Sequence, residues 1–286
     1  MASMRDIKRR KESIQSTGQI TKAMKLVATV KLQKARSRAE NSKPYFDAMY
    51  EAVTSMLAKS GSINHPYLNN DGNGKKAVIV VTSNRGLAGG YNSNVIKAVT
   101  GSGVSKEDML IYAVGRKGKD YFARRGYEIK ADYSDVINEP MYRDAMDIGN
   151  AVLEAYKSGE ISEIYLAYTR FVNTVSQVPV CIKLLPVSTE EVKVKEEADT
   201  GCIMSYEPEE EEALDIIIPK YVCSLIYGAL VESIASENGA RMTAMDNATN
   251  NADEMISDLS LKYNRARQGS ITQELTEIIA GANAIS

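Results

Sequence analysis

The feature that most limits the fold of this 286-residue chain is an apolar pattern in its last third. Residues 220–286 contain no proline, and small or apolar residues recur there at steps of three and four. A stripe that repeats roughly every 3.5 residues lets a helix wind around a partner helix. At about 1.5 Å per residue this helix would extend about 90 to 100 Å, farther than one globular domain can bury. The heptad positions are Val231, Ala235, Asn238, Met242, Met245, Thr249, Ala252, Ile256, Leu259, Tyr263 and Ala266.

A second long helix is predicted for residues 3–59, with Ser3 as its cap and Gly61 beyond its end. Pro44 should kink or interrupt this helix near Ser42, because an internal proline costs about 3 kcal/mol in a regular helix. The apolar stripe is less regular than the C-terminal one and consists of Ile7, Ile14, Ile20, Met24, Val27 and Val30. The residues small enough to let another helix approach closely are Ala23, Ala28, Ala35 and Ala39.

The middle of the chain alternates strands with helices. This order predicts an α/β layer with a largely parallel sheet. The composition then turns acidic and irregular until helix restarts between Pro208 and Pro219. The expected elements are a strand at 77–82, a helix at 92–100, a strand at 109–114, a short helix ending near 125, a helix at 141–157, and strands at 161–169 and 178–186.

We therefore expect an α/β fold in which the N- and C-terminal helices form a long antiparallel coiled coil and flank one inserted Rossmann-like domain. The predicted boundaries are 1–60 for the N-terminal helix, 75–205 for the α/β domain and 209–286 for the C-terminal helix. Two helices at opposite ends of a chain can pair within one molecule, but a heptad seam also fits a self-associating, symmetric dimer. Both pairings remain open on these grounds.

Charge and composition exclude several classes of function. The formal net charge of −2 does not indicate a general nucleic-acid binder, whereas the strongly basic residues 1–40 suggest a specific acidic partner. The chain lacks a run of about 18 apolar residues and a secretory signal, so we expect an intracellular protein without a membrane span. Three widely spaced cysteines and the single histidine, His65, fit neither a zinc site nor a disulfide framework. We expect inert thiols and no catalytic role for His65.

Two glycine-rich turns, at residues 83–91 and 115–118, follow strands and open helices, where a phosphate loop would lie. Neither has the P-loop sequence or the glycine spacing of a dinucleotide site. Glycines in these places also allow a helix to pack closely on a strand. A nucleotide-binding α/β enzyme with helical extensions is therefore kept as the alternative function, and no cofactor is expected.

Several long segments of the chain resemble the gamma subunit of F-type ATP synthase, and the resemblance covers almost the whole length. It implies a rotor shaft that runs inside a hexamer of alternating alpha and beta subunits and turns with the membrane c-ring, with nucleotide chemistry confined to the hexamer. The matching segments are Met4 to Arg10, Gln19 to Ala28, Asn84 to Gly90, Asn173 to Pro179, Ser236 to Met242 and Tyr263 to Ile278.

The same resemblance implies the roles of individual residues. It implies a non-catalytic subunit that contacts the alpha, beta and epsilon subunits and the c-ring. Because the signature starts at residue 4, it favours a bacterial protein, peripheral on the cytoplasmic face of the inner membrane. The sequence leaves open whether the coupling ion is a proton or sodium. The positions for the rotor and hexamer boundary are Met24, Arg241, Arg267, Gln268 and Thr272, and those for the c-ring and epsilon contact are Tyr206 and Glu207.

Overall fold

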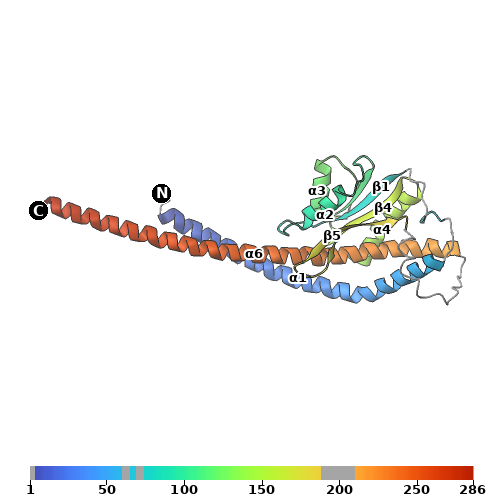
Figure 1. The fold of residues 1–286 in the computed structure, drawn as a ribbon, viewed down its shortest axis with the longest axis horizontal. Helices are drawn as coiled ribbons and strands as arrows, with labels where there is room; N and C mark the ends of the chain where they lie inside the picture. Colours follow the sequence, from blue (N-terminus) through green and yellow to red (C-terminus); the bar gives the residue numbers. More distant parts are fainter. Residues whose placement is uncertain (1–3, 60–64, 69–73, 188–209, 286) are drawn as a thin grey trace. The chain divides into compact units, whose positions relative to one another are not determined.

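The computed structural model describes residues 4–59, 65–68, 74–187 and 210–285. It has two long helices at the ends of the chain, as predicted. The elements are α1 (Met4–Lys59), β1 (Lys75–Val81), α2 (Tyr91–Thr100), β2 (Met109–Val114), α3 (Arg116–Arg124), β3 (Glu128–Asp132), η1 (Val136–Asn138), α4 (Tyr142–Lys157), β4 (Ile161–Phe171), β5 (Gln177–Leu185) and α6 (Glu210–Ile285) (Figure 1).

The chain forms two compact units. The first combines the start of α1 with the end of α6, residues 1–28 and 242–286, and the second is the continuous stretch 29–241. Each unit is described by itself below. The boundaries predicted from the sequence, by contrast, separate the two terminal helices from the α/β domain.

The second unit is built on a five-stranded sheet in the order β3-β2-β1-β4-β5. Neighbouring strands are parallel, except that β5 runs antiparallel to β4. The predicted largely parallel sheet is confirmed, and the antiparallel β5 at its edge was not predicted. The sequence pattern missed β3, whose exposed and half-buried residues alternate and include charged Glu128, Lys130 and Asp132. Such an edge strand lacks the apolar run by which buried strands are recognised.

Both faces of this sheet are covered. In β1, Ala77, Ile79 and Val81 point into one apolar core, which α4 and parts of α1 and α6 complete. Val78 and Val80 point into a second core beneath α2 and α3. Figure 1 shows α2 and α3 together on one side of the sheet. This alternation is the period of two expected for a strand buried on both faces.

The start of α6 lies in the first of these cores. One apolar window of α6 is long and hydrophobic enough, by length and composition, to cross a membrane, and half of that window is buried inside the protein. Leu214, Ile218, Val222 and Ile226 lie at helical spacing and pack in the core of the second unit. Core packing therefore accounts for the hydropathy of this segment.

Of the two outcomes predicted for Pro44, a kink or an interruption of α1, the interruption does not occur, because the helix continues through this residue. Figure 1 shows α1 bending in its light-blue stretch, so the helix accommodates the ring by curvature instead of ending. Next to the proline, Phe46 packs against Tyr227 of α6, with ring centroids 6.0 Å apart, and Tyr45 packs against Tyr142 of α4. Both contacts lie directly after Pro44 and help to hold that part of the helix in place.

In the first unit the C-terminal heptad pattern is confirmed. Met245, Ala252 and Leu259 are buried, whereas most residues between them are exposed. They face α1 of the same chain, since Thr21 and Thr249 share a hydrogen bond of 2.8 Å and Lys25 pairs with Asp246 at 2.6 Å. The seam is therefore used inside one molecule, with the two helices antiparallel, and the symmetric-dimer alternative loses its main support.

The predicted apolar stripe of α1 is partly wrong. Ile20, Val27 and Val30 are each more than half exposed. Small and polar residues form the seam instead: Gly18 lies so close to Ala252 that an added Cβ would be 3.3 Å from the alanine Cβ. The small residues Ala28 and Ala35, predicted to allow close approach, are buried. The apolar stripe alone identified positions that are only half-buried, such as Ile7, Ile14 and Met24.

Glu163 on β4 provides a test of the sheet's electrostatics. Its carboxylate accepts hydrogen bonds from Lys183 at 2.6 Å and Tyr165 at 3.0 Å and pairs with Lys76 at 2.8 Å. Partial burial alone would raise the pKa of Glu163, but these hydrogen bonds outweigh burial and lower the pKa from 4.5 to about 2. The charged carboxylate therefore stabilises the folded state fully above pH 4.5, and this contribution disappears as the pH falls toward 2.

We expect Glu163→Gln to be less stable than the unmodified chain at pH 7, by about 1 kcal/mol given solvent screening. The difference should shrink steadily between pH 4.5 and 2. Urea unfolding at several pH values measures both quantities, and Glu40→Gln, in an exposed pair with Arg36, serves as control. A stability difference that does not change with pH would contradict this origin.

Candidate functional site

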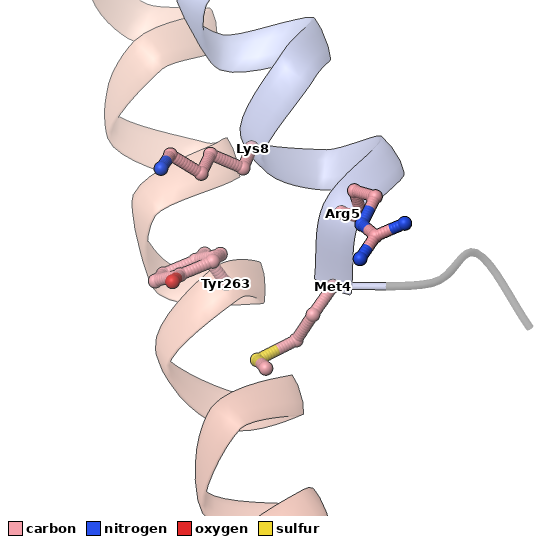
Figure 2. Close-up of a pocket in the computed structure, with 4 residues that line it drawn as sticks. All are labelled: Met4, Arg5, Lys8 and Tyr263. Atoms are coloured by element: carbon pink, nitrogen blue, oxygen red, sulfur yellow. The ribbon is translucent and has the colours of Figure 1, made fainter.

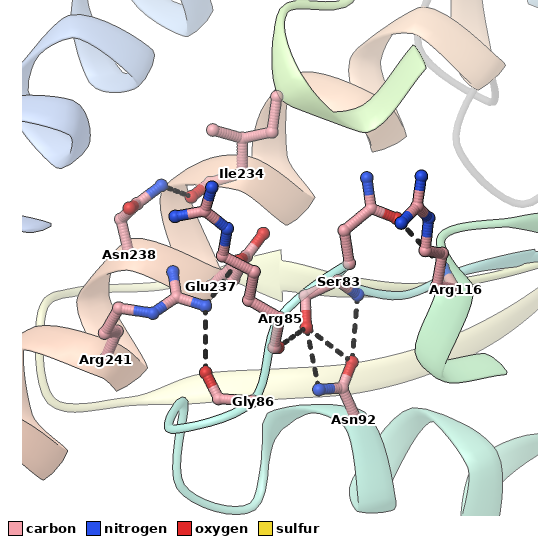
Figure 3. A network of polar contacts seen from close by, with 10 residues as sticks. Ser83, Arg85, Gly86, Asn92, Arg116, Ile234, Glu237, Asn238 and Arg241 are labelled. Atoms are coloured by element: carbon pink, nitrogen blue, oxygen red, sulfur yellow. Dashed lines mark hydrogen bonds and ion pairs between the residues drawn. The ribbon is translucent and has the colours of Figure 1, made fainter. Parts of the chain in front are cut away.

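The first glycine-rich turn is held in a fixed shape by its own side chains. The Ser83 backbone N–H donates to Asn92 Oδ1 at 2.9 Å, and Asn92 Nδ2 donates back to Ser83 Oγ at 2.8 Å. Ser83 Oγ also donates to the Arg85 carbonyl oxygen at 2.6 Å (Figure 3). Leu87 has a positive φ of 64° and is 62% exposed. The loop therefore keeps an apolar side chain in solvent, and the unfavourable backbone conformation of Leu87 costs conformational free energy.

The second glycine-rich turn brings the start of α3 against Thr82, the residue that follows β1. Gly115 has φ +109°, and an added Cβ would lie 2.0 Å from the Thr82 carbonyl oxygen. The first amides of α3 are already bound: those of Lys117 and Gly118 donate to Ser83 O at 3.1 Å and Thr82 Oγ1 at 2.9 Å. A phosphate at this helix start would need those amides. The close-packing interpretation of this turn is therefore confirmed.

Arg241 lies at the meeting point of α6 and the first glycine-rich turn. Its Nη2 atom is 2.6 Å from Glu237 Oε1 and donates to the Gly86 carbonyl oxygen at 3.3 Å (Figure 3). The side chains of Arg241 and Glu237 are only 12% and 13% exposed. Arg241, which the resemblance assigns to the hexamer boundary, is thus held against the glycine-rich turn of its own chain.

A group of buried hydroxyls lies close to this pair. The Tyr91 hydroxyl faces Ser233 and Thr169, and burial, followed by the charge of Glu237, raises its pKa above the usual value. All three hydroxyls are buried. Ser236 Oγ donates to the Thr169 carbonyl oxygen at 3.0 Å. The sequence reasoning missed this cluster, because single serines and threonines carry no signal of their spatial neighbours.

The other predicted residues lie along the helices of the first unit rather than in one site. Met24 is half-buried on α1, next to Lys25. Arg267, Gln268 and Thr272 are exposed on α6, and the Thr272 hydroxyl donates to the Gln268 carbonyl oxygen at 2.9 Å. Tyr206 and Glu207 lie outside the described residues.

The first unit also exposes apolar and basic groups that the sequence analysis did not combine into one site. A groove is lined by Met4, Arg5, Lys8 and Tyr263, and Figure 2 shows Met4 and Lys8 reaching from α1 toward the tyrosine of α6. Farther along α6 the apolar residues recur at helical spacing, which could have revealed them. They are Ile271, Leu275, Ile278 and Ile279, each about half exposed or more.

The two described thiols and the histidine fit structural roles, whereas Cys202 lies outside the described residues. Burial raises the pKa of the Cys181 and Cys223 thiols, which keeps them protonated and unreactive. His65 lies in a loop and accepts a hydrogen bond from the Tyr67 amide through Nδ1, while Nε2 is 3.8 Å from Asp215, a neighbour that the sequence did not reveal. Among the described residues no group of three or more His, Cys, Asp or Glu could hold a metal ion.

Comparisons with known proteins agree over the full length. A family model described as ATP synthase matches residues 3–285. The ATP synthase gamma chain of Lachnoclostridium phytofermentans is 68% identical, and the match covers 100% of both chains. The chain described as "ATP synthase gamma chain, sodium ion specific" from Acetobacterium woodii is 44% identical over 99% of each. A chain of the Euglena gracilis mitochondrial ATP synthase, 21% identical, has the same fold, with a TM-score of 0.70 over 99% of this chain and 94% of its own.

Proposed function

The chain belongs to the ATP synthase gamma chain family, the central-stalk rotor subunits of F-type ATP synthase, and we propose that it works through the paired helices of its first unit, turning inside a hexamer of alternating alpha and beta subunits. Members of this family transmit rotation between the membrane c-ring and the catalytic hexamer, and so couple ion movement to ATP synthesis or hydrolysis. The contacts with individual subunits are part of the proposal.

The observation that supports this role most is the construction of the first unit. Its two helices are joined by an apolar seam, a threonine pair and the Lys25–Asp246 ion pair. Their outer faces nevertheless carry large exposed apolar side chains such as Ile20, Val27 and Ile278. Exposed apolar residues on an otherwise well-paired helix are typical of a surface that another protein encloses.

We assign the coupling contacts to residues on these outer faces. Arg267, Gln268 and Thr272 offer a charge and hydrogen-bonding groups on the exposed side of α6. Met24 offers a flexible, uncharged side chain that can pass carboxylates of the beta subunits without binding them. Tyr206 and Glu207 are proposed to contact the c-ring and the epsilon subunit. The strongly basic start of the chain suits the acidic loops expected of the beta subunits.

We also propose that the subunit itself is non-catalytic and that it lies at the cytoplasmic face of a bacterial inner membrane, held there only through the complex. Its second glycine-rich turn supports the first point, since the α3 amides that a phosphate would need are bound to Ser83 and Thr82. A nucleotide-binding enzyme, the alternative considered from the sequence, has no observation in its favour at this turn.

Purified chain alone should show no ATP turnover above the background of a mock preparation. Adding alpha and beta subunits should produce ATPase activity that depends on all three proteins and that elutes with them as one complex. Gel filtration followed by an ATPase assay tests this. Hydrolysis by rigorously purified chain would contradict the non-catalytic role, and failure to co-elute with alpha and beta subunits would contradict the rotor role.

A further inference from the structure

One stretch of α6, residues 232–241, meets the rest of the second unit through polar contacts. Ser236 donates to the Thr169 carbonyl oxygen at the end of β4, and Arg241 donates to the Gly86 carbonyl oxygen in the first glycine-rich turn. Nearer its start, α6 instead packs into the apolar core through Ile218, Val222 and Ile226. Ile234 and Ala235 continue the apolar packing into this stretch, so directional contacts are added to the apolar ones there.

These polar contacts stabilise the folded state less than apolar contacts of the same shape would. Glu237 and Arg241 are both almost covered, and the hydroxyls of Tyr91, Thr169 and Ser233 are buried beside them. Burying charged or unpaired polar groups costs free energy that an apolar contact of the same shape would avoid. A function other than stability is needed to explain them.

Torque supplies that function, because it twists a helix about its own axis. Apolar contacts depend on buried area and on close packing and have no preferred direction of their own. Hydrogen bonds and ion pairs depend on direction as well as distance, so a small rotation weakens them. A shaft that must turn together with the α/β body is best fixed by directional contacts at the point where the two join.

We propose that Glu237, Arg241 and the Gly86 carbonyl form a torque joint inside the chain. Glu237 is a positioning residue: it holds the guanidinium of Arg241 against Gly86, and this contact fixes the angle of α6 on the glycine-rich turn (Figure 3). The proposal rests on the rotor function proposed above. It differs from the role implied by the resemblance, because Arg241 acts here through its own chain and not through the hexamer.

The test uses the assembled, membrane-embedded complex in inverted vesicles, with ATP hydrolysis and ion transport measured in parallel. Glu237→Gln should retain hydrolysis within about twofold and lower the ions moved per ATP about fivefold or more, since breaking a covered ion pair changes a two-state population by at least that factor. Arg241→Gln should have the same effect. The double variant should lose no more than either single one, because both residues act through one joint.

Glu40→Gln is the matched control. Glu40 pairs with Arg36 at the same i,i+4 spacing and 3.3 Å, but their side chains are 65% and 62% exposed. This variant should leave coupling unchanged. Glu237→Asp keeps the charge on a shorter side chain and should lose part of the coupling. The amount of gamma subunit per beta subunit on the membrane shows whether each variant assembles. If Glu237→Gln does not assemble, Glu237→Asp replaces it in the test.

Normal coupling in Glu237→Gln together with poor coupling in Arg241→Gln would overturn the proposal, because Arg241 would then act on another subunit. The proposal would also be overturned if the loss of coupling in the double variant equalled the product of the losses in the two single variants. If Glu237→Gln does not assemble, normal coupling in Glu237→Asp would overturn it. If the complex with the unmodified chain hydrolyses ATP but moves no ions, the proposed rotor function has failed instead of the joint.

Discussion

Replacing Met24 with lysine is expected to preserve ATP hydrolysis but to lower the ions pumped per ATP. The side chain is half-buried on α1, beside the Lys25–Asp246 pair. Under the proposed assignment it passes acidic groups of the beta subunits as the shaft turns. An ammonium 4 Å from a carboxylate attracts it by as much as about 4 kcal/mol at a surface-like dielectric, before desolvation and side-chain entropy are subtracted. Even a fraction of this attraction energy would make the rotor stay preferentially at some rotation angles.

Salt distinguishes this cause from a packing defect. Exposed charges are screened over about 8 to 10 Å at ordinary ionic strength, so added salt should restore part of the coupling in Met24→Lys. Met24→Leu, an apolar substitution of similar volume, should pump normally at all salt concentrations. Parallel hydrolysis and transport assays in vesicles measure these effects. Unchanged coupling in Met24→Lys at low salt would mean that this position does not face the hexamer.

The largest effect on stability is expected for Gly115→Ala. The backbone here has φ +109°, which an L side chain rarely adopts, and the new Cβ would lie 2.0 Å from the Thr82 carbonyl oxygen. Relief requires α3 to move away from β1 and to break the Gly118 amide bond to Thr82 Oγ1. We expect a loss of at least about 3 kcal/mol, the combined cost of backbone strain and overpacking.

Gly103→Ala separates the two contributions. Gly103 also has a positive φ, of +79°, but an added Cβ there would meet no atom within 4 Å. Only backbone strain is added, so the loss should be about 1 to 2 kcal/mol. Urea unfolding of the purified variants measures both values. Equal losses for the two variants would show that the contact with Thr82 does not determine the effect.

The sequence predicted best what depends on local periodicity. The α6 seam was correct, residue by residue at Met245, Ala252 and Leu259, because a heptad repeat reports which face of a helix is covered. The α1 stripe was partly wrong at Ile20, Val27 and Val30, because helices that approach closely at Gly18 select for size and not for hydrophobicity.

The candidate site depended on contacts that no local pattern contains. Arg241 and Gly86 are 155 positions apart, and only the fold brings them together. The partner of Glu237 could have been anticipated, since oppositely charged residues four apart on a helix commonly pair. The burial of this pair could not have been anticipated, because it depends on how the end of β4 and the first glycine-rich turn lie against α6. The glycines of the second turn were assigned correctly because close packing needs only the local strand–turn–helix order.

Rotation of this chain within its complex tests the central claim most directly. The alpha and beta subunits would be fixed to a surface, and a visible probe attached to the α/β body through a cysteine at exposed Glu107, in a chain whose three native cysteines are replaced. When ATP is supplied, the probe should turn continuously in one direction, and its speed should follow the rate of hydrolysis. A probe that stays still while the same complexes hydrolyse ATP at full rate would contradict the rotor function.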